Sequence, residues 1–172
     1  SISSPCLGMS IGNDFMCALH DNGTSACWGD NIKGRLGTGG NTDSTTPVAT
    51  HTDTLFTSIE SGARHTCAVT SAGAMECWGD NSYAQMAETP WVSGMGGTKS
   101  FKSPNPITEL NSETITKVSI GNDSYFTAVL TNTGVVKAWG TFNGTEYQDH
   151  FDVNSGVATD VAARGLDIEA LS

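Results

Sequence analysis

Positive charge is scarce in this chain. Its 172 residues include 8 Lys and Arg against 18 Asp and Glu, so the formal net charge is −10 at pH 7. The few basic residues are scattered and form no patch. Nucleic acids and anionic membrane surfaces attract proteins through clustered positive charge. We therefore expect neither of them as a partner.

Long apolar segments are also lacking. The chain has no run of about 18 apolar residues, the length that a membrane-spanning helix needs, and no secretory signal peptide. It begins at Ser1 rather than Met, as a processed chain or a fragment would. No long helical pattern occurs, whereas 20 glycines separate short β-prone runs. This composition predicts an all-β protein of short strands and many turns.

Motifs for catalysis and metal binding are missing as well. The sequence contains no C-x-x-C, H-E-x-x-H or phosphate-binding loop. The histidines lack the spacing of metal ligands; they are His20, His51, His65 and His150. The Asp-Asn pairs at 30–31 and 80–81 could hold calcium, but their equivalent turn positions favour capping of backbone N–H groups. We therefore expect no enzyme activity, no cofactor and no metal.

What the chain does contain is an internal repeat. Residues 12–31 recur at 62–81, at an offset of 50 residues. A fixed period of this kind is typical of repeat architectures. The positions that are identical in both copies are Gly12, Cys17, Ala18, Gly23, Cys27, Trp28, Gly29, Asp30 and Asn31.

Each copy of the repeat is predicted to form a β-hairpin. The loop ends at Gly23 or Gly73, and a three-residue loop with a left-handed glycine is a common hairpin connection. Counting outward from that loop places the two cysteines of each copy opposite each other, with Cβ atoms about 4.5–5.5 Å apart. A disulfide needs about 3.5–4.5 Å, so a small adjustment suffices. The predicted disulfide pairs are Cys17 with Cys27 and Cys67 with Cys77; the alternative is two buried free thiols in each hairpin.

Paired cysteines are typical of an oxidising compartment, so we expect an extracellular or cell-surface location. Cys6 is left without a partner, and either it bonds to another chain or it is buried and free. Asn22, Asn122 and Asn143 match the N-glycosylation pattern, although a chain this rich in Asn, Ser and Thr contains such matches by chance. Asn22 is the best candidate for a glycan because it should lie at a hairpin tip.

The repeat divides the chain into modules of one domain, residues 1–172. The modules cover about 1–50, 51–105 and 106–156, and part of a fourth covers 157–172. In the third module, Thr127 and Ala138 are aligned with the cysteine positions, which requires a hairpin loop one residue longer, through Gly134. No disulfide is expected there.

The order Gly-x4-Cys-Ala-Leu, Gly, Cys-Trp-Gly-Asp-Asn, Gly-x-Leu-Gly and Pro resembles the regulator-of-chromosome-condensation repeat, of the paired-cysteine type found in secreted and cell-surface proteins. The resemblance implies a β-propeller of four-stranded blades, typically seven in number. Three modules and part of a fourth are too few to close such a ring. The residues for the family's chromatin-binding and nucleotide-exchange roles do not occur here. Trp28, Trp78 and Trp139 are expected to pack between blades.

Two segments, 88–105 and 142–155, exceed the repeat length and provide candidate binding loops. Their aromatic residues either bind a partner or pin down the loops; they are Trp91, Phe101, Tyr147 and Phe151. Two functions stay open. One is a structural, self-assembling subunit of a filament, ring or surface coat, whose open blades are completed by neighbouring chains. The other is a recognition or inhibitor module, or a fragment of a larger receptor, that binds a protein or glycan.

Overall fold

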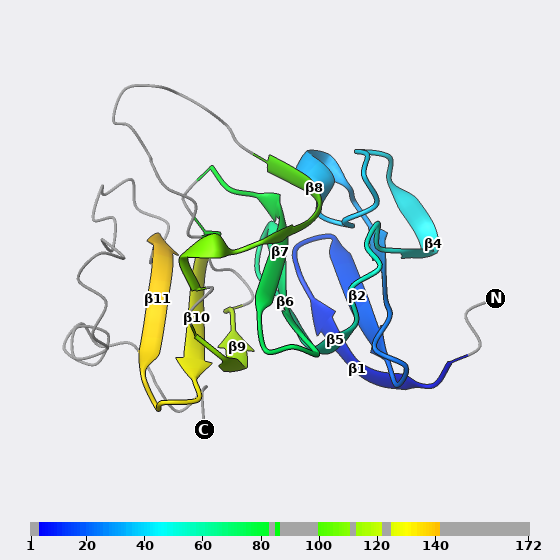
Figure 1. Cartoon of the computed structure of the whole chain (residues 1–172). Helices are drawn as coiled ribbons and strands as arrows, with labels where there is room; N and C mark the ends of the chain where they lie inside the picture. Colours follow the sequence, from blue (N-terminus) through cyan, green and yellow to red (C-terminus); the bar gives the residue numbers. More distant parts are fainter. Residues whose placement is uncertain (1–3, 83–84, 87–99, 111–112, 122–124, 142–172) are drawn as a thin grey trace.

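Three antiparallel β-sheets lie side by side in chain order (Figure 1). The computed structural model describes residues 4–82, 85–86, 100–110, 113–121 and 125–141. The first sheet, or first blade, has the strand order β1-β2-β3-β4. Its elements are β1 (Cys6–Ile11), β2 (Phe15–His20), β3 (Ser25–Gly29), the short 3-10 helix η1 (Ile32–Gly34) and β4 (Ser44–Ala49).

The second blade repeats this order as β5-β6-β7-β8, and the third has the order β11-β10-β9 in the described residues. The elements of the second blade are β5 (Phe56–Ser61), β6 (His65–Thr70), β7 (Met75–Asp80) and β8 (Ser100–Pro106). A second 3-10 helix, η2 (Thr108–Leu110), leads to the third blade, which comprises β9 (Ile115–Ser119), β10 (Tyr125–Thr131) and β11 (Val136–Thr141). The prediction of an all-β repeat protein with four-stranded units is confirmed.

The central hairpin of each blade has a three-residue loop, as predicted for the first two blades. In the first blade the His20 N–H donates to the Thr24 carbonyl at 2.9 Å, and the Gly23 N–H donates to the His20 carbonyl at 2.9 Å. Gly23 has a φ of 83°, in the left-handed region that glycine adopts without steric cost. Gly73 and Gly134 close the other two hairpins in the same conformation, each with a φ of 80°.

The expected longer loop of the third hairpin is wrong. The Thr131 N–H donates to the Val135 carbonyl at 2.9 Å, and the Gly134 N–H donates to the Thr131 carbonyl at 3.0 Å, the pattern of the first hairpin. Without an extra loop residue, the register places Ala128 opposite Ala138. These two alanines occupy the positions of the cysteine pairs, and Thr127 is instead equivalent to Thr66 of the second blade, which also pairs with a tryptophan.

The apolar core lies between the blades in two clusters. In each cluster, one blade contributes its cysteine pair and neighbouring apolar residues, and the next blade contributes its tryptophan and first strand. The cluster between the first and second blades contains Phe15, Cys17, Leu19, Cys27, Leu36, Phe56, Ile59, Ala68 and Trp78. The cluster between the second and third blades contains Cys67, Val69, Met75, Cys77, Met86, Ile107, Leu110, Ile115, Val118, Ile120, Val129 and Trp139.

The first strands bring successive blades together. β5 contacts β1 and β2, and β9 contacts β5 and β6. At both junctions a backbone bond joins the first strand of one blade to the hairpin glycine of the blade before it: Phe56 N–H to Gly23 carbonyl and Ile115 N–H to Gly73 carbonyl, each 2.8 Å. The hairpin tips of the first and second blades thus each contact the blade that follows. Among the described residues, no helix is long and apolar enough to cross a membrane.

Candidate functional site: an open blade face

Both predicted cysteine pairs are joined as disulfides. The Sγ–Sγ distance is 2.10 Å for Cys17–Cys27 and 2.14 Å for Cys67–Cys77, and the Cα atoms of each pair are 4.1 Å apart. Cys17 lies directly opposite Cys27, and Cys67 lies opposite Cys77, in the register that the hairpin count predicts. All four cysteines are fully buried, so each disulfide also forms part of the apolar surface on which the next blade packs.

Replacing both Cys67 and Cys77 by alanine should lower the free energy of unfolding by about 2–3 kcal/mol, because the bridge restricts a short loop of the unfolded chain. The Ala128–Ala138 pair shows that this blade position accommodates two alanines. Chemical denaturation under non-reducing conditions measures the change. Cys6→Ser is the control for thiol removal, and it should change the stability by less than about 0.5 kcal/mol. A double alanine variant as stable as the control would contradict this expectation.

Trp78 fills the interface between the first two blades. Its side chain is 0% exposed, and its ring centroid is 6.0 Å from that of Phe56. On the other side it faces the turn at Gly37, where an added Cβ would approach the indole Nε1 to 2.9 Å. Gly37 has a φ of 67°, so this position combines a left-handed backbone with a close approach. The tryptophan of the next blade therefore packs against the Gly-x-Leu-Gly turn of the repeat.

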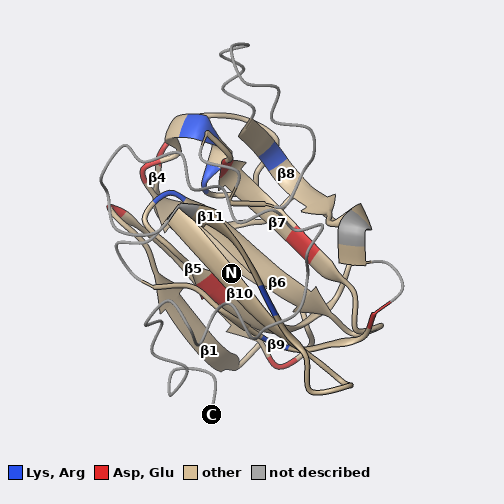
Figure 2. Ribbon diagram, turned by 90° about the vertical axis from the view of Figure 1, so that its left-hand side faces the viewer, with Lys and Arg blue, Asp and Glu red and all other residues tan. Residues whose placement is uncertain are grey.

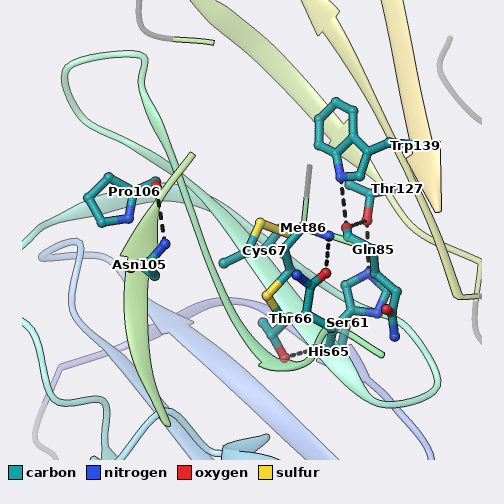
Figure 3. Close-up of a disulfide and its surroundings, with 12 residues drawn as sticks. Ser61, His65, Thr66, Cys67, Gln85, Met86, Asn105, Pro106, Thr127 and Trp139 are labelled. Atoms are coloured by element: carbon teal, nitrogen blue, oxygen red, sulfur yellow. Dashed lines mark hydrogen bonds between the residues drawn. A yellow bond between two sulfur atoms is a disulfide. The ribbon is translucent and has the colours of Figure 1, made fainter. Parts of the chain in front are cut away.

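Trp139 occupies the corresponding position between the second and third blades, and it is held by hydrogen bonds (Figure 3). Its Nε1–H donates to the backbone carbonyl of Gln85 at 2.7 Å. The hydroxyl of Thr127 donates to the same carbonyl at 2.8 Å. His65 Nε2 lies 2.8 Å from this hydroxyl oxygen. Because Thr127 uses its single proton toward Gln85, His65 must donate from Nε2–H.

Burial keeps His65 uncharged. The side chain is 0% exposed, and desolvation lowers its pKa from 6.5 to about 3, although the negative charge of Asp80 opposes the shift. Among the described residues its Nδ1 has no hydrogen-bond partner. In the first blade the equivalent position is Phe15, an apolar residue. Sequence reasoning missed this group because its partners come from different blades, and the only signal is the substitution of His for Phe at the repeat offset.

The Asp-Asn pairs cap the turns after the hairpins, as predicted. The carboxylate of Asp30 accepts the Ile32 N–H at 2.7 Å, and the carboxylate of Asp80 accepts the Ser82 N–H at 3.0 Å. Asn31 and Asn81 accept the N–H of the residue five positions later, at 2.9 and 2.8 Å. The aspartates also pair with arginines, Asp30 with Arg35 at 3.2 Å and Asp80 with Arg64 at 3.9 Å. No group of three or more candidate metal ligands occurs within the described residues.

The first blade exposes an apolar face on the side away from the second blade. Cross-strand pairing places Met9, Ile11, Met16 and Trp28 on one side of the sheet, opposite to the side that carries the buried Cys17. We call this surface the open face; it also includes Cys6, which pairs with His20. Met9 is 67% exposed and Ile11 56%, and Leu7, in the bulge beside Cys6, is 65% exposed. Three exposed large apolar side chains on one strand are unusual for a free surface.

The expectation that Trp28 packs between blades is wrong for the described chain. Trp28 is only half-buried, whereas its counterparts Trp78 and Trp139 are buried in the two clusters. The reason is positional: each tryptophan packs against the preceding blade, and among the described residues no blade lies on this side of the first one. Trp28 is thus part of the open face.

Cys6 is exposed, so the alternative of a buried free thiol is wrong. It stands at the repeat position of Phe56, since Cys6 pairs with His20 in the first blade and Phe56 pairs with Thr70 in the second. Phe56 packs against the second blade's tryptophan. The free thiol therefore lies on the open face, at a position that is buried against the preceding blade in the second repeat.

Phe101 is not a loop residue. It lies in β8, pairs with Gly79, and packs against both apolar clusters, which favours the structural explanation for this aromatic residue.

Asn22 is exposed at the tip of its hairpin, as predicted, where its Oδ1 accepts the Thr24 N–H at 3.1 Å. The remaining candidates lie outside the described residues: Trp91, Tyr147, Phe151, Asn122, Asn143 and the partial module 157–172.

Lys and Arg make up few segments of the described ribbon, and several of these segments lie near β4 and β8 at the top of the view, with Asp and Glu segments nearby (Figure 2). Two of the arginines stack on aromatic rings at the blade junctions: Arg35 lies 6.0 Å from the ring centroid of Phe15, and Arg64 lies 5.6 Å from that of Tyr125. Arg35 and Arg64 thus contribute to the packing of the blades.

The comparisons with known proteins agree with this geometry. The Regulator of chromosome condensation (RCC1) repeat matches residues 8–35 and 56–85, and a second description of the same repeat matches residues 27–69. Among solved structures, human WBSCR16 superposes with a TM-score of 0.69 at 20% identity, over 81% of this chain and 34% of that protein. Prp20p from Saccharomyces cerevisiae superposes with a TM-score of 0.69 at 18% identity, over 83% of this chain and 32% of that protein.

A further structure, of yeast RCC1 (Prp20) bound to Kap60, has a TM-score of 0.68 at 19% identity and covers 83% of this chain and 31% of that one. The chain spans about a third of the length of these neighbours. No curated protein matches its sequence. The stacked blades, in which Trp78 and Trp139 each pack on the blade before, define a β-propeller repeat protein. Residues 8–85 match the RCC1 repeat, and the chain has the fold of RCC1-like β-propeller repeat proteins.

Proposed function

We propose that this chain is a non-enzymatic, extracellular protein-binding module that assembles with neighbouring copies through its blades. The open face carries this proposal. The equivalent face of the second blade is buried, with Ile59 at 7% exposure and Trp78 at 0%, whereas Met9, at the position of Ile59, is 67% exposed. The same face of the sheet is buried in the second blade and exposed in the first. A neighbouring chain can bury the exposed face.

Physical chemistry favours a protein as the occupant of this face. It is apolar, it lies on a sheet, and the chain's net charge of −10 disfavours nucleic acid. Burying apolar surface contributes roughly 25 cal/mol per Å², and each exposed Met or Ile side chain offers a substantial area. Yeast RCC1 (Prp20), which has the same fold, is bound to Kap60 in one structure, and Prp20p is described as having binding properties to Gsp1p and histones. Protein binding is thus an established use of the fold in that protein.

The extracellular location rests on the two buried disulfides, since such bonds persist in oxidising compartments. The non-enzymatic role is supported by the structural contacts of the buried polar groups. Asp30 and Asp80 cap turns and pair with arginines, and His65 is buried and neutral in a hydrogen-bond network. The alternative of ligand recognition through aromatic loops loses one of its candidates, because Phe101 packs in the core.

Sedimentation velocity over a range of concentrations tests the proposal on the full chain. The wild-type chain should form oligomers, and Met9→Glu should raise the dissociation constant at least tenfold, because about 1.4 kcal/mol corresponds to tenfold and a buried unpaired carboxylate costs more than that. Ile32→Glu is the matched control: Ile32 is 57% exposed but lies in η1, off the open face, so assembly should persist. A wild-type chain that stays monomeric at every concentration would show the proposal to be wrong.

A further inference from the structure

We infer that Asn22 carries an N-linked oligosaccharide, and that the end of the blades formed by the hairpin loops 21–23 and 71–73, which we call the tip face, stays in solvent. The inference rests on the extracellular location in the proposed function, because N-linked sugars are attached to secreted chains. Asn22, Gly23 and Thr24 form the acceptor pattern, although this chain also contains such matches by chance. The bonds of the three hairpin tips distinguish this match from a chance one.

The first hairpin satisfies its tip differently from the other two. In the second and third hairpins, the hydroxyl of a threonine at the end of the incoming strand accepts the N–H that follows the glycine. These bonds join Ala74 N–H to Thr70 Oγ1 at 3.1 Å and Val135 N–H to Thr131 Oγ1 at 3.2 Å. In the first hairpin the strand position of these threonines is occupied by His20. The Thr24 N–H donates instead to Asn22 Oδ1, at 3.1 Å.

This change of acceptor explains Asn22 but not the hydroxyl of Thr24. The positions equivalent to Thr24 are Ala74 and Val135, which have no hydroxyl. The Thr24 hydroxyl donates to Asn22 Oδ1 at 2.7 Å, in addition to the backbone bond. Hydrogen bonds polarise the groups that they join, so two donors on Oδ1 make the Nδ2–H protons of the amide more acidic. An amide nitrogen is a weak nucleophile, and the loss of such a proton is what allows it to accept a sugar.

Asn22 is accessible between two fixed neighbours. The Asp21 N–H donates to the Pro5 carbonyl at 3.0 Å, and the Gly23 carbonyl accepts the Phe56 N–H at 2.8 Å. Both bonds use the backbone, so a group attached to the Asn22 side chain leaves them intact. Asn22 is exposed, and within the described residues its Nδ2 makes no hydrogen bond. The side-chain oxygen therefore holds the turn while the nitrogen is available for the reaction.

The sugar donor is an oligosaccharide carried on a lipid pyrophosphate. Asn22 Nδ2 attacks the anomeric carbon of the first sugar, a C–N bond forms, and the C–O bond to the pyrophosphate breaks. The nitrogen releases one proton, and the lipid pyrophosphate leaves with the bonding electrons, so nothing is oxidised or reduced. Oδ1 is unchanged in the product and still accepts both bonds from Thr24. The turn thus keeps its conformation after the modification.

The glycan lies beside an exposed apolar side chain of the second blade. Leu55 is 46% exposed, and a Cβ built on Gly23 would lie 3.0 Å from the Leu55 Cβ. An N-linked glycan is bulky and solubilising. At Asn22 it shields Leu55 and prevents close docking of another protein on the tip face. Contacts between copies then use the faces of the sheets, as the proposed function requires.

Secretion of the full chain from eukaryotic cells, behind a cleavable leader, tests the inference. Peptide mass spectrometry locates the glycan before and after treatment with peptide N-glycosidase, which converts a glycosylated asparagine to aspartate. The wild-type chain should be modified at Asn22. Thr24→Ala should lose this glycan, whereas Thr24→Ser, which keeps a hydroxyl, should retain it. Ala72→Asn/Ala74→Thr is the matched positive control, because it introduces the same three-residue pattern at the equivalent exposed tip of the second hairpin.

Each result decides between the inference and the proposed function. An unmodified Asn22, with or without modification of the positive control, would overturn the inference and leave the proposed function standing. After enzymatic removal of the glycan, sedimentation should show the same oligomers as before. A chain that associates only after removal would show that the tip face is a docking surface, which contradicts the inference. If Asn22 is modified and the chain is monomeric both with and without the glycan, the glycan stands and the proposed assembly is wrong.

Discussion

Replacing Trp78 by alanine should lower the free energy of unfolding by about 3–5 kcal/mol, the usual cost of removing a buried large aromatic side chain. Trp78 is 0% exposed and joins two blades, where it contacts Phe56 and the turn at Gly37. The rigid blades cannot collapse fully into the space that the indole leaves, so a cavity term adds to the lost burial. Chemical denaturation of the variant and the wild-type chain measures the difference.

The chain provides a matched control for this experiment. Trp28 has the same position in the first blade but is only half-buried, so Trp28→Ala should cost less than about 1 kcal/mol when measured on dilute protein. Trp78→Phe should fall between the two, because the indole Nε1 has no hydrogen-bond partner among the described residues and only part of the ring volume is lost. Equal costs for the two alanine variants would contradict the packing that we describe.

The comparison of the two tryptophans also separates folding from assembly. At concentrations where copies associate, the open face becomes buried, and Trp28→Ala should then weaken association while leaving the unfolding of the isolated chain nearly unchanged. Trp78→Ala should reduce stability at every concentration, because both blades that bury Trp78 belong to one chain.

Much of the fold could be predicted from local chemistry. Glycines at 23 and 73 determine the hairpin loops, and the two-residue period of a strand then places each cysteine opposite its partner. Asp30 and Asn31 cap a turn because their short side chains reach backbone N–H groups nearby. These contacts span few residues, so the sequence pattern contains the whole interaction.

The errors concern contacts that the local pattern does not contain. The run from Tyr125 to Val129 is β-prone in either register, and only the hydrogen bonds of the Gly134 loop decide that Ala128 takes the cysteine position. Residues 88–105 are predicted to be a candidate binding loop, yet residues 100–105 belong to β8. Its prolines are tolerated because β8 is the outermost strand of its sheet.

Trp28 illustrates the limit most clearly. Its local sequence is the same as that of Trp78, and its hairpin has the same register, but its burial depends on a neighbour that the repeat itself does not specify. The hydrogen-bond group of His65, Thr127 and Gln85 was missed for a related reason. It forms across a blade junction, and its central acceptor is the backbone carbonyl of Gln85. Every residue has such a carbonyl, so the residue type does not predict the contact.

His65 should make the stability of the protein depend on pH. Its pKa is about 3 in the folded protein and near 6.5 in the unfolded chain, so between these values the unfolded chain binds a proton that the folded protein does not. The free energy of unfolding should therefore fall as the pH is lowered from 6.5 toward 3, with a slope of up to about 1.4 kcal/mol per pH unit from this group. Below the folded-state pKa, the contribution stops changing.

The replacement His65→Phe isolates this effect, because Phe15 occupies the equivalent position of the first blade and is 3% exposed there. The variant keeps Glu60, whose pKa is raised by burial and which therefore contributes a pH dependence of opposite sign, and it keeps the other carboxylates. Denaturation series at several pH values between 4.5 and 6.5 should show a steeper loss of stability for the wild-type chain than for the variant. Parallel curves would contradict a lowered pKa of His65 in the folded protein.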